Sequence, residues 1–311
     1  MKYDIIGDIH GQAQKLINLL QKLGYKKHNG IYQQVGHQAI YVGDFIDRGP
    51  YQKQVIGIVR PMIENDHALA VMGNHEFNAI CYHTKHNEKQ NEYLRGHNEK
   101  NKKQHEAFLE EYSLGDEETD ELIDWFKTLP LFLELDAFRV IHACWDQNII
   151  TELQKNRLTE DNCLLVSSYA DASSEDHLLY NSIETLLKGK ELQLPDGMTF
   201  KDKDGNERHE IRIKWWADNV KTYQQASVLE IPSLTNTPEI IIDKNKVEIG
   251  YPLQDKPVFF GHYWFTGTPK SVAYNVACLD YSAAKEGPLV AYRWGTSDLK
   301  KLNNNQFILS D

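Results

Sequence analysis

The chain has few cysteines, no long apolar run and no excess of basic residues. Its four cysteines, Cys81, Cys144, Cys163 and Cys278, are scattered without a C-x-x-C pair. This spacing argues against a zinc knuckle or a disulfide framework and favours free thiols in a reducing compartment. No segment approaches the roughly 18 apolar residues of a membrane span, and the amino terminus has no apolar leader or cleavage site. We therefore expect a cytoplasmic location and no membrane partner.

The shortage of positive charge limits the classes of partner. The formal net charge is −11, from 34 Lys and Arg against 45 Asp and Glu, which argues against broad nucleic-acid binding because that requires a basic surface. A phosphorylated substrate remains compatible with this charge, since bound metal cations can reverse the local field. No composition break divides the 311 residues, so we predict a single domain spanning 1–311.

The first 80 residues alternate apolar runs with helical patterns. Leucines at 16, 19, 20 and 23 predict an amphipathic helix that stops near Gly24, and apolar residues at 55–59 predict another that ends at Pro61. Strands are expected at 3–7, 39–42, 68–72, 138–141, 258–260 and 276–279. Strands that alternate with helices in short units indicate an α/β fold with parallel pairs.

Two long segments carry less chemical information. Residues 82–125 are polar at first and predict a helical excursion, in which His83, His86, His97 and His105 are expected to be exposed because no apolar residues hold them. Metal binding by these histidines is the weaker alternative. Residues 146–256 form an insertion that we expect to shape the substrate pocket, with β structure from Leu192 to Trp216. Within it, Trp215-Trp216 would either line a pocket or pack in the core.

Residues able to ligate metal follow five of the apolar runs. In open α/β sheets sites lie outside the carboxyl ends of the strands, so residues far apart in sequence can converge there. Each of these residues alone is weak evidence, but together they predict one site. The predicted metal ligands are Asp8, His10, Asp44, Asn74, His142 and His262.

The ligand types favour a pair of hard or borderline metal ions. Oxygen and imidazole donors without thiolate suit manganese, iron or zinc. Two such ions about 4 Å apart need a bridging carboxylate and lower the pKa of a bridging water, which gives a hydroxide nucleophile for in-line attack. Phosphoryl transfer also needs a cation on the non-bridging oxygens and an acid for the leaving oxygen. Arg48 and His75 can fill these two roles, and Asp47 can orient the imidazole.

These motifs resemble the calcineurin-like metallophosphoesterases, and within them the phosphoprotein-phosphatase branch. That branch is marked by GD-x-H-G, GD-x-x-DRG, GNHE and two later histidines. The matching residues in this chain are Gly7-Asp8-Ile9-His10-Gly11, Gly43-Asp44-Phe45-Ile46-Asp47-Arg48-Gly49, Gly73-Asn74-His75-Glu76, His142 and Gly261-His262.

The resemblance implies a fold and a role for each matching residue. The fold is a β-sandwich of two mixed sheets flanked by helices, here with a long insertion. Asp8 and His10 correspond to ligands of the first metal and Asp44 to the bridge. The second metal is assigned Asn74, His142 and His262. His75 corresponds to the general acid, Asp47 to its partner, and Arg48 and Asn74 to substrate contacts. The implied cofactors are two divalent ions, manganese in the first place and iron or zinc as alternatives.

Two departures bear on the substrate. Ser/Thr phosphatases of this branch carry an arginine before GNHE, where this chain has Met72, and His-Gly-Gly where it has His142-Ala143-Cys144. The bacterial dinucleoside-tetraphosphate hydrolases also lack that arginine and share features around Leu129-Pro130-Leu131. The first hypothesis is therefore a two-metal phosphoesterase whose substrate is a dinucleoside polyphosphate, a phosphoprotein or a small phosphomonoester, and these features favour the dinucleoside polyphosphate. The alternatives are a Ser/Thr or Tyr protein phosphatase, a phosphodiesterase for nucleic-acid ends and an inactive metal-binding scaffold.

Overall fold

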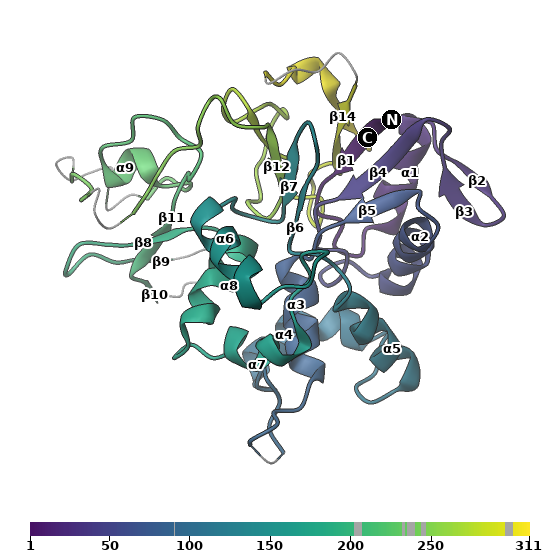
Figure 1. Cartoon of the computed structure of the whole chain (residues 1–311), viewed down its shortest axis with the longest axis horizontal. Coiled ribbons are helices and arrows are strands. Elements are labelled where there is room, and N and C mark those ends of the chain that lie inside the picture. Colours follow the sequence, from purple (N-terminus) through teal and green to yellow (C-terminus); the bar gives the residue numbers. More distant parts are fainter. Residues whose placement is uncertain (90, 202–206, 232–233, 235–239, 244–246, 296–300) are drawn as a thin grey trace.

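Two mixed β-sheets form the centre of the computed structural model, which describes all residues except 90, 202–206, 232–233, 235–239, 244–246 and 296–300 (Figure 1). The first sheet has the order β15-β14-β1-β4-β5 and the second the order β13-β12-β7-β6. Within the first sheet β1 is parallel to β4 and antiparallel to β14, and the second sheet is also mixed. The strands of these sheets are β1 (Lys2–Ile6), β4 (His37–Tyr41), β5 (Ala68–Ala70), β6 (Phe132–Glu134), β7 (Arg139–Ile141), β12 (Val258–Phe260), β13 (Val276–Cys278), β14 (Val290–Trp294) and β15 (Phe307–Leu309).

Helices cover the outer faces, and short two-stranded ribbons complete the fold. In Figure 1 the helices α3, α4, α5 and α7 lie below the two sheets. The helices are α1 (Ala13–Leu23), α2 (Gln52–Glu64), α3 (Asn74–His83), α4 (Glu99–Leu109), α5 (Glu117–Phe126), α6 (Gln147–Asn156), α7 (Tyr169–Ala172), α8 (Leu178–Lys188) and α9 (Tyr223–Ala226), with 3₁₀ turns η1 (Val166–Ser168) and η2 (Asn304–Gln306). The ribbon strands are β2 (Lys26–His28), β3 (Ile31–Gln33), β8 (Glu191–Gln193), β9 (Phe200–Lys201), β10 (Glu207–Arg208) and β11 (Glu210–Arg212).

Alternating side chains of the strands divide the core into two layers. In β1, Ile5 joins the cluster shared by the two sheets, whereas Ile6 joins the larger cluster packed against the helices. In β4, Ile40 and Tyr41 divide in the same way, as the two-residue period of a strand requires. Both faces of these strands are buried at their carboxyl ends, and there the sequences Ile5-Ile6 and Ala39-Ile40-Tyr41 are continuously apolar. The predicted sandwich of mixed sheets with flanking helices is confirmed.

The second helix corrects one prediction. Pro61 lies inside α2 and does not end it, since the helix continues to Glu64. Proline here removes only one backbone hydrogen bond, in the last turn. The carbonyl of Pro61 accepts hydrogen bonds from the backbone and the side-chain amide of Asn65, at 3.2 and 2.9 Å. The next residue, Met62, is fully buried, so its packing in the core stabilises the helix beyond the proline.

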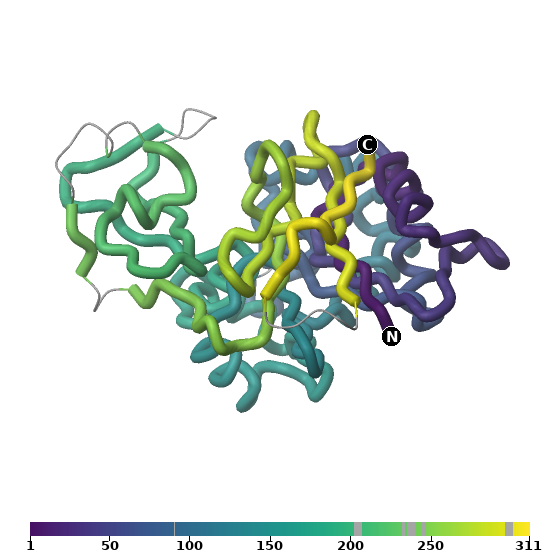
Figure 2. Tube along the Cα trace, turned by 90° about the horizontal axis from the view of Figure 1, so that it is seen from above, coloured from purple at the N-terminus to yellow at the C-terminus, as the bar shows by residue number. Residues whose placement is uncertain are grey.

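The segment between His142 and His262 contributes its own small core. Leu192, Leu194, Ile211 and Ile213 form part of a hydrophobic cluster separate from the sandwich, and this part projects to one side in both views (Figures 1 and 2). Its connection to the sandwich runs through Trp215, whose indole N–H donates to the carbonyl of Ala143 at 2.9 Å. Trp215 and Trp216 are both buried against Phe260, so the pair packs in the core.

All four cysteines are buried free thiols. Among the residues that the structure describes, no helix combines the length and apolarity needed to cross a membrane.

A buried carboxylate joins three strands of the first sheet. Asp4 on β1 is fully buried. Its oxygens accept hydrogen bonds from Arg293 on β14, at 2.7 and 3.2 Å, and one of them lies 3.0 Å from Nδ1 of His37 on β4. Removing one partner of a buried ion pair leaves an uncompensated charge, which is costly.

We expect Arg293→Gln to lower the free energy of unfolding by about 2 kcal/mol, below the full cost of breaking a buried pair because Arg293 is itself 28% exposed. The matched control is Arg60→Gln, which removes the exposed pair with Glu64 and should cost at most about 0.5 kcal/mol. Urea denaturation measures both. Equal losses in the two variants would contradict the structural role of Asp4.

Candidate metal centre and active site

The predicted ligands converge where β1, β4, β5, β7 and β12 end. The loops after these strands approach one another closely, and glycine permits this. A Cβ on Gly73 would lie 2.2 Å from a carboxylate oxygen of Asp44, and one on Gly261 would lie 1.9 Å from a carboxylate oxygen of Asp8. Several site residues have positive φ, a conformation that costs energy and clusters at functional sites. These residues are His10, Asp44, Asp47, Arg48, His262 and Trp264.

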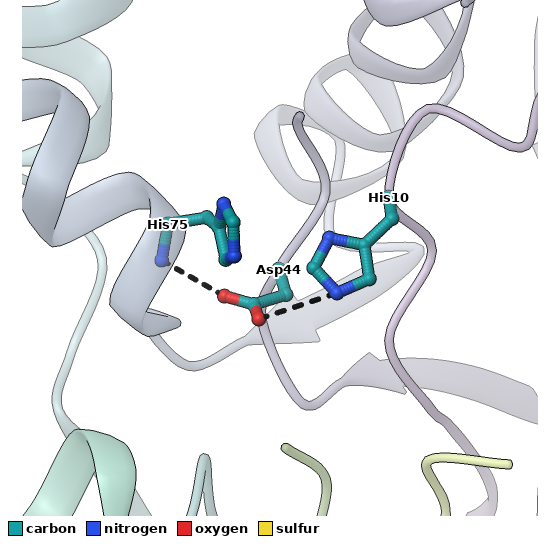
Figure 3. A group of neighbouring side chains, drawn as sticks. All are labelled: His10, Asp44 and His75. Atoms are coloured by element: carbon teal, nitrogen blue, oxygen red, sulfur yellow. Dashed lines mark hydrogen bonds and ion pairs between the residues drawn. The ribbon is translucent and has the colours of Figure 1, made fainter. Parts of the chain in front are cut away.

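Asp44 lies between His10 and His75, with one carboxylate oxygen directed to the His10 ring and the other to the backbone N–H of His75 (Figure 3). Its Oδ2 is 3.5 Å from Nε2 of His10 and 3.4 Å from Nε2 of His142. Its Oδ1 accepts the backbone N–H of His75 at 2.9 Å. The side chain is 2% exposed. The position between two imidazoles is the one that the sequence assigned to a bridging ligand.

A second group of donors surrounds the amide of Asn74, the first residue of α3. Its Oδ1 lies 3.1 Å from Nε2 of His142 and 2.7 Å from Nδ1 of His262. Backbone carbonyls orient the imidazoles of His142 and His10. Nδ1 of His142 lies 2.7 Å from the carbonyl of Val42, and Nδ1 of His10 lies 3.0 Å from that of Ile46. Such outer contacts select which nitrogen faces a metal.

Three buried polar atoms in this group have no hydrogen-bond partner in the part of the chain that the structure describes. They are Oδ1 of Asp8, Nε2 of His10 and Nε2 of His262. The other oxygen of Asp8 accepts the backbone N–H of His262 at 2.9 Å. Buried polar atoms are normally paired, so unpaired donors of ligand type around Asp44 fit metal coordination. Among the described residues, two sets of side chains whose atoms could hold a metal ion meet at this carboxylate, one with His10 and His75 and one with His142 and His262.

The electrostatics of the group also fit bound cations. Burial lowers the pKa of His10 to about 3 and holds that of His262 well below its usual value, so both imidazoles are neutral, as metal ligands must be. Burial and Asp280 raise the pKa of Asp8. Burial lowers the pKa of His142, but Asp44 and Asp8 raise it overall to about 10. The carboxylates thus favour positive charge between them.

His75 and Asp47 form the predicted pair. Nδ1 of His75 lies 2.6 Å from Oδ2 of Asp47, and the His75 ring is 4.8 Å from that of His10. Burial lowers the pKa of His75, whereas Asp44 and Asp47 raise it, and the net shift is upward. The imidazole therefore retains a proton more readily than a free histidine, as a general acid requires.

One histidine of the polar excursion also belongs to this site, contrary to expectation. His105 on α4 is 5% exposed, and its Nδ1 lies 2.9 Å from Oδ1 of Asp47. Its ring stacks on Phe108 with centroids 4.5 Å apart. The prediction that apolar residues do not hold the histidines is wrong here, because Phe108 and Tyr112 follow His105 at helical spacing.

Two further buried carboxylates, Glu76 and Asp280, hold loops of the site in place. The sequence assigned neither of them a role. Glu76 accepts the backbone N–H groups of Gly73 and Asp44 at 2.9 and 2.8 Å, and that of Phe45 at 2.8 Å. Burial and Asp44 raise its pKa to about 7. Asp280, at the end of β13, accepts the N–H groups of Trp264 and Ser282 at 2.7 and 2.9 Å. The sequence contains one local sign of each role. Glu76 directly follows the Asn74-His75 motif, and Asp280 directly follows the apolar run 276–279.

Arg48 rests against an aromatic ring beside the metal-binding group. Its guanidinium lies 4.2 Å from the centre of the Trp264 ring, and the ammonium of Lys285 lies 4.9 Å from the same ring. The Trp264 ring is 5.7 Å from that of His10. Arg48 and Lys285 are exposed, and neither has an acidic partner among the residues that the structure describes. Both cations can therefore contact an anionic substrate.

Comparison with known proteins places this arrangement in a family. The model of the calcineurin-like phosphoesterases matches residues 1–226. The chain is 34% identical over 167 residues to an asymmetrical bis(5'-nucleosyl)-tetraphosphatase of Oceanobacillus iheyensis, over 51% of this chain and 62% of that protein. It is 43% identical over 76 residues to the protein of the same name from Halalkalibacterium halodurans, covering 24% and 31% of the two chains. The chain thus spans less than two thirds of either relative.

Among solved structures, a protein serine/threonine phosphatase from Saccharomyces cerevisiae aligns with 99% of this chain and 78% of its own, at 15% identity and a TM-score of 0.49. The family match covers most of the ligand-bearing loops described above. This match confirms the family resemblance that the motifs predicted. The chain belongs to the calcineurin-like phosphoesterase family.

Proposed function

We propose that this chain is a two-metal phosphoesterase that hydrolyses a nucleotide polyphosphate. The observation that carries the proposal is the set of buried, unpartnered ligand atoms on Asp8, His10 and His262 around the carboxylate of Asp44. Asp8, His10 and Asp44 would hold one divalent ion, and Asp44, Asn74, His142 and His262 the other. Manganese suits this donor set, with iron or zinc as alternatives.

Each residue near these ligands has a distinct chemical task. The bound ions would supply Lewis acidity and an acidic water. Arg48 would contact the non-bridging oxygens of the phosphoryl group, since its guanidinium is exposed and held against Trp264. His75 would donate a proton from Nε2 to the leaving oxygen while its Nδ1 remains bonded to Asp47.

The substrate class follows from a second cation next to this group. Lys285 shares the Trp264 ring with Arg48, so two positive charges without an acidic partner among the described residues lie against the aromatic ring that adjoins His10. A single phosphate needs one such contact, whereas a phosphate chain can engage both. Asp280 and Lys15 hold the loop that bears Lys285, the latter through carbonyls of Ala283, Lys285 and Gly287 at 2.8–3.0 Å. The name of the two relatives agrees with this substrate.

The metal assignment predicts a change in stoichiometry. The wild-type chain reconstituted with Mn²⁺ should bind about two ions, and His262→Ala should bind about one, because it removes a ligand from one set only. Elemental analysis after desalting measures this. His97→Ala serves as the control and should keep both ions. An unchanged content in His262→Ala would rule out its role as a ligand.

The role of His75 predicts a loss of turnover without a loss of metal. With Mn²⁺, His75→Asn should lower kcat on diadenosine tetraphosphate about 100-fold or more, the usual contribution of a general acid, and should keep its manganese. Asp44→Asn should lose both metal and activity. Full activity in Asp44→Asn would sink the proposed mechanism.

The role of Lys285 predicts a dependence on the length of the phosphate chain. Lys285→Met should raise KM for diadenosine tetraphosphate about fivefold, since an exposed charge contributes at most about 1 kcal/mol, and should leave KM for p-nitrophenyl phosphate unchanged. Lys155→Met, which removes an exposed lysine on α6, is the control. Equal effects on both substrates would contradict a polyphosphate contact, and activity on phosphopeptides alone would favour a protein phosphatase.

A further inference from the structure

His105 joins the helical segment 82–125 to the catalytic pair. Asp47 uses both carboxylate oxygens, Oδ2 toward Nδ1 of His75 at 2.6 Å and Oδ1 toward Nδ1 of His105 at 2.9 Å. The backbone N–H of Asp47 donates to Oε1 of Gln52 at 2.9 Å. The three contacts approach Asp47 from α3, α4 and α2, so α3 and α4 orient its carboxylate and α2 holds its backbone.

The His105 side chain is held rigidly. Its ring stacks on Phe108 at an interplanar angle of 15° and packs against Tyr82 with centroids 5.1 Å apart. Phe108 is fully buried and stacks in turn on Tyr112. An imidazole fixed in this way can hold a carboxylate in one rotamer, which a flexible surface histidine cannot.

Asp47 and His83 contact opposite nitrogens of the His105 ring. A carboxylate only accepts, so Nδ1 of His105 donates to Asp47. Nε2 of His105 then lies 3.2 Å from Nε2 of His83, the last residue of α3. Burial and His105 lower the pKa of His83 to about 3, so His83 is neutral. His83 thus occupies the Nε2 side of the His105 ring, and Nδ1 faces Asp47.

We propose that His105 is a positioning residue for the proposed general acid His75, acting through Asp47. The proposal rests on the proposed function, because it assumes that His75 protonates the leaving oxygen. His105 prevents rotation of the Asp47 carboxylate, and Asp47 holds the Nδ1–H of His75, so that Nε2 faces the substrate. His105 itself touches neither the ligand atoms nor the substrate contacts.

Two conservative substitutions separate positioning from bulk packing. In His105→Asn the amide nitrogen occupies nearly the position of Nδ1, so the donor to Asp47 is retained. In His105→Gln the amide lies one bond further along the side chain, and the donor is displaced. Both variants remain polar and of similar size. We expect kcat to stay within about twofold of wild type for Asn and to fall about tenfold for Gln, a part of the general-acid contribution.

A comparison of kcat on two esters with different leaving groups distinguishes the loss of positioning from a loss of folded protein. Phenyl phosphate releases a more basic oxyanion than p-nitrophenyl phosphate, so it depends more on protonation by His75. We expect His105→Gln to lose kcat mainly on phenyl phosphate, with KM unchanged for both esters and manganese content as in the wild type. His97→Ala is the matched control, because His97 lies in the same segment and stacks on Tyr82 without contact to Asp47.

The outcomes are distinguishable. Equal kcat values for His105→Asn and His105→Gln on phenyl phosphate, or equal losses on the two esters, would overturn the positioning role while leaving the proposed function intact. A wild-type chain that is loaded with Mn²⁺ and hydrolyses neither ester nor diadenosine tetraphosphate would overturn the proposed function, and this inference with it. Loss on phenyl phosphate confined to His105→Gln would support the proposal.

Discussion

The burial of the Asp44 carboxylate is the constraint on which the site depends. A buried charge is tolerated only when it is paired and hydrogen-bonded, and burial alone raises the pKa of this carboxyl. His142 and His75 nevertheless hold its pKa well below the usual value. The loops that bring these groups together need Gly73 at the point of closest approach. Glu76 then fixes the Asp44 loop through backbone N–H groups.

The fold separates two tasks around this carboxylate. Most of the proposed ligands follow strand ends of the sandwich, so they are placed by the same packing that stabilises the sheets, and Asn74 also begins α3. Helices and loops outside the sandwich carry the residues that we propose to handle protons and phosphate. His75 and His105 come from α3 and α4, and Trp264 and Lys285 from loops tied by Asp280. Changes in α4 and in the loops of Trp264 and Lys285 would therefore leave the proposed metal ligands in place.

The sequence was most informative where a strand ends in a ligand. An apolar run followed by Asp, Asn or His is local, so the positions of Asp8, Asn74 and His262 could be predicted. His105 could not, because its contact to Asp47 spans 58 residues and depends on how α4 packs. The same applies to Trp264, whose neighbours Arg48 and Lys285 are distant in sequence. The prediction that α2 ends at Pro61 was wrong, because a proline in the last helical turn removes only one hydrogen bond.

The central claim is that two metal ions share Asp44. The most direct test is a crystal structure of the manganese-loaded chain with anomalous diffraction measured at the manganese edge. The account predicts two anomalous peaks, one on each side of the Asp44 carboxylate, with Asp8 and His10 at the first and Asn74, His142 and His262 at the second. A single peak, or peaks that do not contact Asp44, would contradict it.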